Sequence, residues 1–238
     1  MEQGTTERLD VPAAYAVVVD HLRRAIHLGQ YAPGDKFPPE RQHAEALGVS
    51  RVTLRGAIRV LEGEGYVKTR RGSSGGVTVL GSTETRGQLV ERLRHNIDDL
   101  LAVQEFRLVN ERLAAERAAT RLTAEDLDGL ERSVGQIERA DGVGGFRQAD
   151  SFFHLQIAGA AECELLRDAV EDARAAMFLP LDALDYKLLV TETLKDHRRV
   201  LAALQARDAA RAGRAMAAHV RRTSEQLQQI LADPAHGS

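Results

Sequence analysis

From about Gln88 to Leu231 the sequence has the apolar spacing of helices throughout. Aromatic residues are only 4% of the chain and Trp is absent, which favours helices packed through small and aliphatic side chains over a β-sandwich or barrel. One run begins with Thr123 and Asp126, a pair that resembles a capping box with Asp in place of the usual Glu or Gln. We predict an all-α bundle of six to seven helices, with the strongest helical runs at 97–121, 124–139, 146–159, 165–178, 191–205 and 208–231.

The chain before Gln88 is organised differently. Apolar residues predict a helix over 11–28, and a Pro-Gly turn separates it from a short helix over 39–48. Ser50 is a suitable N-cap for a third helix that starts at Arg51 and ends at a pair of glycines. Its buried face is expected to contain Leu54, Ala57, Ile58 and Leu61. Two short strands, 66–69 and 77–80, then flank a basic, glycine-rich tip, and this order of elements is that of a winged helix-turn-helix.

Charge separates the two regions. Residues 21–80 hold ten Lys and Arg against five acidic residues, a net charge of +5, whereas residues 81–238 carry −5 and the first twenty residues −3. A basic module on an acidic body is typical of a DNA-binding protein, although chance clustering would give the same numbers. We expect a disordered tail at 1–10, the winged helix-turn-helix domain at 11–80 and a polar linker at 81–92. The helical domain is expected at 93–231 and a second tail at 232–238.

The third helix is the candidate reader of DNA. Arg51 and Arg55 are four residues apart and so lie on one helical face, and Thr53 and Arg59 are near enough to reach phosphates or bases. Arginine can bond guanine O6 and N7 in a bidentate manner. Each arginine taken alone is more often a solvated surface residue. The glycine turn, the Ser50 cap and the basic hairpin together favour DNA reading.

Several motifs in order resemble the DNA-binding domain of GntR-type bacterial transcription regulators. They are the runs Pro33-Gly-Asp-Lys-Phe-Pro-Pro-Glu-Arg41, Leu47-Gly-Val-Ser-Arg-Val-Thr-Leu-Arg55 and Leu61-Glu-Gly-Glu-Gly-Tyr-Val67. The family usually has Ser where Pro39 stands. The resemblance implies that the hairpin tip lies in the minor groove of operator DNA. It assigns the DNA interface to Arg41, Arg51, Thr53, Arg55, Arg70, Arg71, Gly72 and Gly75.

The helical region contains a candidate metal site. Asp150 and His154 are spaced i, i+4 and therefore face the same side of a helix. His197 and His219 would be about 33 Å apart on one straight helix, but residues 206–208 predict a turn with Asp208 as N-cap. The two arms of that hairpin are about 15 and 18 Å long, which brings both imidazoles to one level. Three imidazoles and a carboxylate can hold a divalent ion with coordination positions left open, although a lone histidine is more often a bonded core or surface residue.

Residues from about Asp99 to Arg222 resemble the FCD domain, the helical ligand-binding domain of the FadR subfamily. Asp150, His154, His197 and His219 match the order of ligands in its metal-binding members. The resemblance implies a divalent ion, with Zn²⁺ expected and Ni²⁺ or Mn²⁺ as alternatives, and a small organic acid as effector. The segment 105–111 resembles a helix whose arginine, here Arg107, faces the effector; a surface pair of Arg107 with Glu111 is the alternative. Many members have Asn near the position of Cys163.

These observations predict a ligand-responsive transcription regulator, expected to be a repressor, that binds a palindromic operator as a homodimer. The alternatives are a regulator that senses the metal itself and a metal-dependent hydrolase, although no general base or nucleophile motif accompanies the histidines. No apolar stretch approaches the roughly 18 residues that span a bilayer, so we expect no membrane partner. The polar N-terminus and the single cysteine predict a cytoplasmic protein. We expect no enzymatic activity, because an enzyme would leave residues 11–80 without a role.

Overall fold

The computed structural model describes residues 14–70, 72, 75–81, 86–181 and 186–232. They form two compact units, which we describe in turn. The expected tails at 1–10 and 232–238 lie almost wholly outside the described residues. None of the helices in the described ranges combines the length and the apolar character needed to cross a membrane.

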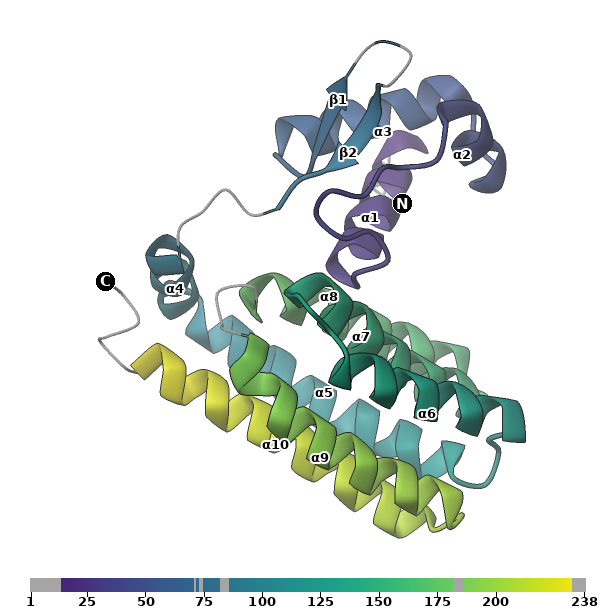
Figure 1. The fold of residues 1–238 in the computed structure, drawn as a ribbon, viewed down its shortest axis with the longest axis vertical. Helices are drawn as coiled ribbons and strands as arrows, with labels where there is room; N and C mark the ends of the chain where they lie inside the picture. Colours follow the sequence, from purple (N-terminus) through teal and green to yellow (C-terminus); the bar gives the residue numbers. More distant parts are fainter. Residues whose placement is uncertain (1–13, 71, 73–74, 82–85, 182–185, 233–238) are drawn as a thin grey trace, which may run out of the picture. The chain divides into compact units, whose positions relative to one another are not determined.

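The first unit is a winged helix-turn-helix, as predicted (Figure 1). Strand β2 pairs antiparallel with β1, with Val67 opposite Val79 and Arg70 opposite Gly76. An isolated bridge between Lys36 and Thr78 adds the preceding loop to this small sheet. The elements of the unit are α1 (Ala14–His27), α2 (Glu40–Ala46), α3 (Arg51–Gly63), β1 (Val67–Arg70) and β2 (Gly76–Val79).

Local sequence explains where α2 and α3 begin. The side chain of Ser50 accepts a hydrogen bond from the backbone N–H of Thr53, which confirms the predicted N-cap of α3. Pro39 stands at the N-cap of α2 and supplies no side-chain hydrogen bond there, because its ring carries no acceptor. The predicted apolar face of α3 is buried and forms the core of this unit with residues of α1 and β1, namely Val18, Leu22, Leu54, Ala57, Ile58, Leu61 and Val67.

The second unit is the predicted helical bundle. All six helical runs expected from the sequence are present, and their bounds agree within a few residues, apart from α9, which begins five residues early. Helix α7 also begins earlier than expected, so that Gly144 and Gly145 belong to its first turn rather than to a loop. The helices are α4 (Arg86–His95), α5 (Ile97–Ala118), α6 (Ala124–Glu138), α7 (Val143–Ala160), α8 (Glu164–Leu181), α9 (Tyr186–Gln205) and α10 (Ala209–Ala232).

Helix α4 occupies part of the segment 81–92 that its polar composition assigns to a linker. Among the α4 residues whose burial the structure describes, Val90 and Leu93 are buried. Two buried apolar positions give the sequence of α4 only a weak apolar period. The remaining linker residues 82–85 lie outside the described part.

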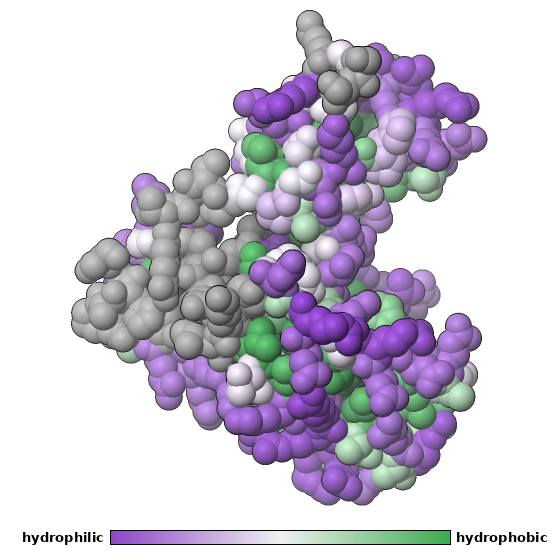
Figure 2. Space-filling model, in the orientation of Figure 1, coloured by the Kyte–Doolittle hydropathy of each residue, from purple (hydrophilic) through white to green (hydrophobic). Residues whose placement is uncertain are grey.

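Helix α5 is the centre of the bundle and packs against α7, α8 and α10. Gly213 of α10 lies so close to Glu116 of α5 that an added Cβ would overlap its side chain, which shows how tightly these two helices approach. The space-filling view shows a mainly hydrophilic surface over the bundle with separate hydrophobic patches (Figure 2). The apolar core therefore lies between the helices, where it surrounds the buried polar residues described below.

Helices α9 and α10 form the antiparallel hairpin that the sequence predicts. Arg207 adopts a left-handed φ of 56°, and the side chain of Asp208 accepts a hydrogen bond from the backbone N–H of Arg211 at 2.9 Å. The reversal between the two helices is thus complete within three residues. It brings the ring centroids of His197 and His219 to 4.9 Å from each other, so the two imidazoles do lie at one level.

Candidate nucleic-acid interface and metal centre

Helix α3 presents two arginines on one exposed face. Arg51 is its first residue and Arg55 follows one turn later, and their side chains are 58% and 55% exposed. Thr53 lies between them, and its hydroxyl is 2.8 Å from that of Ser50 at the cap. The structure therefore places Arg51 and Arg55 on one face of α3 and Thr53 at its N-terminal cap.

Glu40 of α2 connects the two arginines. Its Oε1 accepts a hydrogen bond from Nε of Arg51 at 2.7 Å, and its Oε2 accepts one from Nε of Arg55 at 2.6 Å. These bonds lower the pKa of Glu40 below its ordinary value, the bond from Arg55 most strongly. The sequence alone does not predict this role of Glu40, because a contact across 11 to 15 residues depends on the angle between α2 and α3.

The other predicted DNA contacts lie on α2 and the hairpin. Arg41 on α2 and Arg70 at the end of β1 are exposed. Gly72 has a φ of 112°, and its carbonyl accepts a hydrogen bond from the N–H of Gly75 at 3.0 Å, which closes the tip. Arg71 lies outside the described residues.

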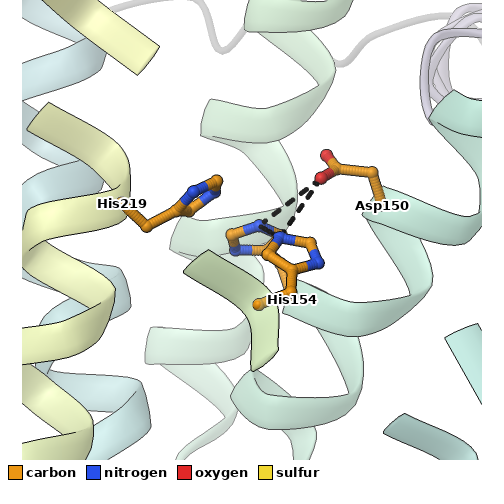
Figure 3. A group of neighbouring side chains, drawn as sticks. Asp150, His154 and His219 are labelled. Atoms are coloured by element: carbon orange, nitrogen blue, oxygen red, sulfur yellow. Dashed lines mark hydrogen bonds and ion pairs between the residues drawn. The ribbon is translucent and has the colours of Figure 1, made fainter. Parts of the chain in front are cut away.

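In the helical bundle, four predicted residues form one buried cluster. Asp150 and His154 come from α7, His197 from α9 and His219 from α10, and one ligand atom of each lies within 4.8 Å of the others. Figure 3 shows Asp150 and His154 of α7 and His219 of α10 pointing toward one another. The exposed fractions of the four residues do not exceed 6%, so the cluster is closed to bulk water.

The distances define which atoms converge. His154 Nε2 lies 3.2 Å from His197 Nε2 and 3.9 Å from Asp150 Oδ1, and His197 Nε2 lies 3.4 Å from the same oxygen. The ring of His197 stacks on Phe153, with centroids 3.9 Å apart and planes inclined by 9°. Two imidazole nitrogens and one carboxylate oxygen therefore face one centre, and His219 completes the donor set.

Two further carboxylates lie behind the imidazoles. Glu111 of α5 contacts Nδ1 of His154, and Asp196 of α9 lies 3.6 Å from Nδ1 of His219. A carboxylate at one ring nitrogen fixes the orientation of an imidazole and leaves the other nitrogen for a metal. The residues present therefore fit a divalent ion with nitrogen and oxygen ligands.

Buried charges balance around the cluster. Arg174 is fully buried and pairs with Asp150, while Nε of Arg107 donates to Glu111 at 2.7 Å. Burial alone would raise the pKa of Asp150, but the charges of Arg174 and of the three histidines together outweigh burial and hold this pKa well below the ordinary value. Burial, aided by Arg174, lowers the pKa of His154 to about 4, so this imidazole is neutral at physiological pH. A neutral imidazole is the form that binds metal.

Comparisons with known proteins agree with both parts of this structure. Residues 14–77 match the family of bacterial regulatory proteins called the gntR family, and residues 102–222 match the FCD domain. The Uxu operon transcriptional regulator of Escherichia coli K12 is 31% identical over 223 residues, which are 90% of this chain and 86% of that protein. The Uxu operon regulator of Haemophilus influenzae is 30% identical over 236 residues, 91% of this chain and 83% of that regulator.

This chain belongs to the GntR family and carries an FCD domain. It is a bacterial transcription regulator and not an enzyme, so the hydrolase alternative is set aside. Among solved structures, Escherichia coli McbR/YncC matches with a TM-score of 0.56 at 19% identity, over 92% of this chain and 99% of that one. A GntR regulator from Rhodococcus sp. RHA1 matches with a TM-score of 0.51 at 23% identity, over 90% of this chain and 97% of that one. These two structures support the fold.

A small pocket of the FCD domain adjoins the cluster. Asp150 and His219 form one side of it, and Arg107 lies among its other lining residues. The predicted pair of Arg107 with Glu111 is present. Arg107 is only 1% exposed, so the pair is buried and not on the surface, as the alternative had it. The neutral polar side chains at the pocket are Thr193, Thr223 and Gln226.

Three charged residues of the site were missed or misplaced by sequence reasoning. Glu111 was considered only as a surface partner of Arg107, and Arg174 and Asp196 were not singled out. Asp196 directly precedes His197, and its partner Arg222 follows His219 by three residues. A pair of opposite charges, each close in sequence to a histidine of the cluster, is the signal that could have drawn attention to Asp196. Cys163 is a free, half-buried thiol that packs against the core and is not part of the cluster.

Proposed function

We propose that this GntR regulator responds to a small carboxylate bound at a divalent metal in its FCD domain. The observation that carries the proposal is the convergence of Asp150, His154, His197 and His219 within 4.8 Å. Zn²⁺ is the expected ion, and Ni²⁺ and Mn²⁺ suit the same nitrogen and oxygen donors. When bound, such an ion supplies a Lewis-acidic centre that attracts anionic oxygens.

Charge counting favours an anionic effector. Asp150 and Glu111 are balanced by Arg174 and Arg107, and the imidazoles are neutral when they bind metal. A divalent ion therefore adds two uncompensated positive charges to a buried site. Buried charge is costly unless it is paired, so a carboxylate is the ligand that the loaded site favours.

The pocket beside the cluster supports this placement. Arg107 lines it together with Asp150 and His219, so a guanidinium stands near the ion position. Nε of Arg107 donates to Glu111 and its Nη1 to Gln104, so Nη2 is the group left to donate to a carboxylate. Thr193, one turn before His197, and Thr223, one turn after His219, add hydroxyl groups to the lining. This combination favours a hydroxy acid or sugar acid as the effector.

For the DNA-binding domain, we propose that Arg51 and Arg55 read guanine edges in the major groove, with Thr53 and Arg41 beside them. Their exposure on one face of α3 supports this role. Arg70, Gly72 and Gly75 of the hairpin are proposed to contact the backbone and minor groove, and the prediction for Arg71 stands on the sequence alone.

A homodimer is the proposed assembly, because one recognition helix reads a half-site and a two-fold protein matches a palindromic operator. Phe106, Val109 and Leu113 of α5 support it. They recur on one helical face and are 49%, 65% and 46% exposed, which is unusual for large apolar side chains unless a partner covers them.

The effector would act by favouring one dimer arrangement, since a ligand shifts an equilibrium only through differential affinity. We propose that the regulator is a repressor of the FadR subfamily and that the effector releases the operator. A coupling free energy of about 1–3 kcal/mol corresponds to a change in operator affinity of about 5–150-fold.

The test begins with a thermal-shift screen of sugar acids, hydroxy acids and dicarboxylates, with and without chelator. Affinity for DNA selected from a random pool is then measured with the stabilising acid. Native protein and the control His95→Ala, an exposed histidine of α4, should respond equally, whereas His154→Ala should lose the response. An equal response in His154→Ala would mean that the metal is not the effector's anchor.

A further inference from the structure

One carboxylate holds two arginines of the candidate DNA interface. Glu40 is the first residue of α2, and each of its oxygens accepts a hydrogen bond from a different arginine of α3: Oε1 from Arg51 at 2.7 Å and Oε2 from Arg55 at 2.6 Å. The two arginines are one turn apart, so a single planar carboxylate spans the distance between their guanidinium groups.

The atoms used in these contacts leave the ends of both arginines available. Each arginine donates to Glu40 through Nε, and within the described ranges their Nη atoms donate no hydrogen bond. The side chain of Glu40 is 29% exposed, less than those of Arg51 and Arg55 at 58% and 55%. The carboxylate thus binds the inner edge of each guanidinium and leaves the outer edge to a ligand.

Recognition of guanine requires this outer edge in a fixed plane. The O6 and N7 acceptors of guanine are met by two parallel N–H donors, which the Nη1 and Nη2 groups supply together. A free arginine side chain samples many rotamers, and holding it beforehand reduces the entropy lost on binding.

A carboxylate at this place also carries a disadvantage. The hydrogen bonds from Arg55 and Arg51 lower the pKa of Glu40, so the group is ionised at neutral pH. A negative charge beside the reading face repels DNA phosphates and weakens binding to every sequence. Glu40 should therefore reduce non-specific affinity, while its benefit is confined to the contacts that distinguish one base from another.

We propose that Glu40 is a positioning residue for base reading: it holds Arg51 and Arg55 through Nε so that the Nη1 and Nη2 groups of each meet guanine end-on. This inference rests on the proposed role of the two arginines and adds the residue that sets their geometry. It predicts opposite effects of Glu40 on the two kinds of DNA binding, favourable for the operator and unfavourable for unrelated sequences.

The experiment uses the full chain and a DNA sequence that the native protein selects from a randomised pool. Each guanine of that sequence is replaced in turn by 7-deazaguanine, which lacks the N7 acceptor, and affinities are measured at one salt concentration. The variants are Glu40→Gln, Glu40→Asp and the control Glu45→Gln, which removes an equal charge from an exposed position on the same helix. Circular dichroism establishes that each variant is folded.

Native protein and Glu45→Gln should lose about tenfold or more in affinity when a guanine read by Arg51 or Arg55 loses N7. In Glu40→Gln the loss should fall to about threefold or less, while affinity for unrelated DNA stays level or rises. Glu40→Asp should resemble Glu40→Gln, because it keeps the charge but is too short to reach both arginines. That result separates geometry from charge.

Two results would overturn the proposal in different ways. If Glu40→Gln binds the selected DNA more tightly and keeps the full dependence on N7, Glu40 is a competitor that the arginines leave on binding. If native protein shows no dependence on N7 at any guanine, the reading role of Arg51 and Arg55 fails, and the role of Glu40 fails with it.

Discussion

Glu111 contacts Nδ1 of His154, and the opposite ring nitrogen of His154 lies 3.2 Å from Nε2 of His197. The carboxylate comes from α5 and the imidazole from α7, so the packing of these two helices determines the orientation of the ring. The contact links the core of the bundle directly to the ring of His154, whose Nε2 is its proposed metal-binding nitrogen.

Removal of this contact should weaken metal binding. Partners behind metal-binding histidines contribute about 10–100-fold in metal affinity, so we expect a loss of that size in Glu111→Gln. Competition with a chromophoric Zn²⁺ chelator measures the affinity. Glu105→Gln on the exposed face of α5 is the control and should retain native affinity; an equal affinity in Glu111→Gln would show that Glu111 serves only to neutralise Arg107.

The sequence predicted the four members of the metal cluster because their relationship is local or nearly so. Asp150 and His154 share one helical face, and the turn before Asp208 determines how far His197 and His219 lie from the reversal. Sequence reasoning also predicted the helical runs of the FCD domain, most of them within a few residues of the observed bounds.

The charged residues behind the cluster could not be predicted in this way. Arg107 and Glu111 form an i, i+4 pair that on an isolated helix would be solvated. They are buried because α5 is covered by α7, α8 and α10, and Arg174 reaches the cluster from α8. Such contacts depend on how helices pack, which leaves no periodic signal in the sequence.

Arg107 provides a test of effector binding that leaves the metal ligands intact. Arg107→Lys keeps the charge but lacks the planar guanidinium that can donate to Glu111, Gln104 and a carboxylate ligand at once. We expect it to lower the affinity for the stabilising acid by about 10–100-fold, as for the loss of a charge-assisted hydrogen bond, with metal content unchanged. Isothermal titration measures the acid, and native affinity in the variant would remove Arg107 from the effector site.

The recognition arginines should determine base preference. Arg51→Ala and Arg55→Ala should each cost about 1–3 kcal/mol on the selected DNA and relax the preference for guanine. Arg112→Ala, an exposed arginine of α5, should leave affinity and preference as they are. Unchanged sequence preference in both α3 variants at fixed salt would contradict the assignment of this helix.

The cap of α6 should contribute stability that depends on pH. The backbone N–H of Thr123 donates to Asp126 at 2.8 Å, and this bond and that from the Thr123 hydroxyl lower the pKa of Asp126. A carboxyl group with a lowered pKa stabilises the fold above its unfolded pKa of about 3.9, and the contribution disappears as the pH falls through the folded value.

Asp126→Asn should therefore destabilise the protein by about 1 kcal/mol at pH 7, a typical value for a helix cap, and by less as the pH falls below about 4. Urea unfolding in the presence of chelator, followed by circular dichroism at several pH values, measures the difference. Asp128→Asn, an exposed position on the same helix, should show little effect at any pH. A penalty for Asp126→Asn that does not change with pH would contradict the role of its charge.

The most direct test of the account is the metal content of the protein. Elemental analysis should find one divalent ion per chain in native protein and in the control His95→Ala. The double variant His197→Ala/His219→Ala should contain almost none, because it lacks the α9 and α10 ligands while Asp150 and His154 remain. Equal metal content in the native protein and the double variant would contradict the proposed metal centre.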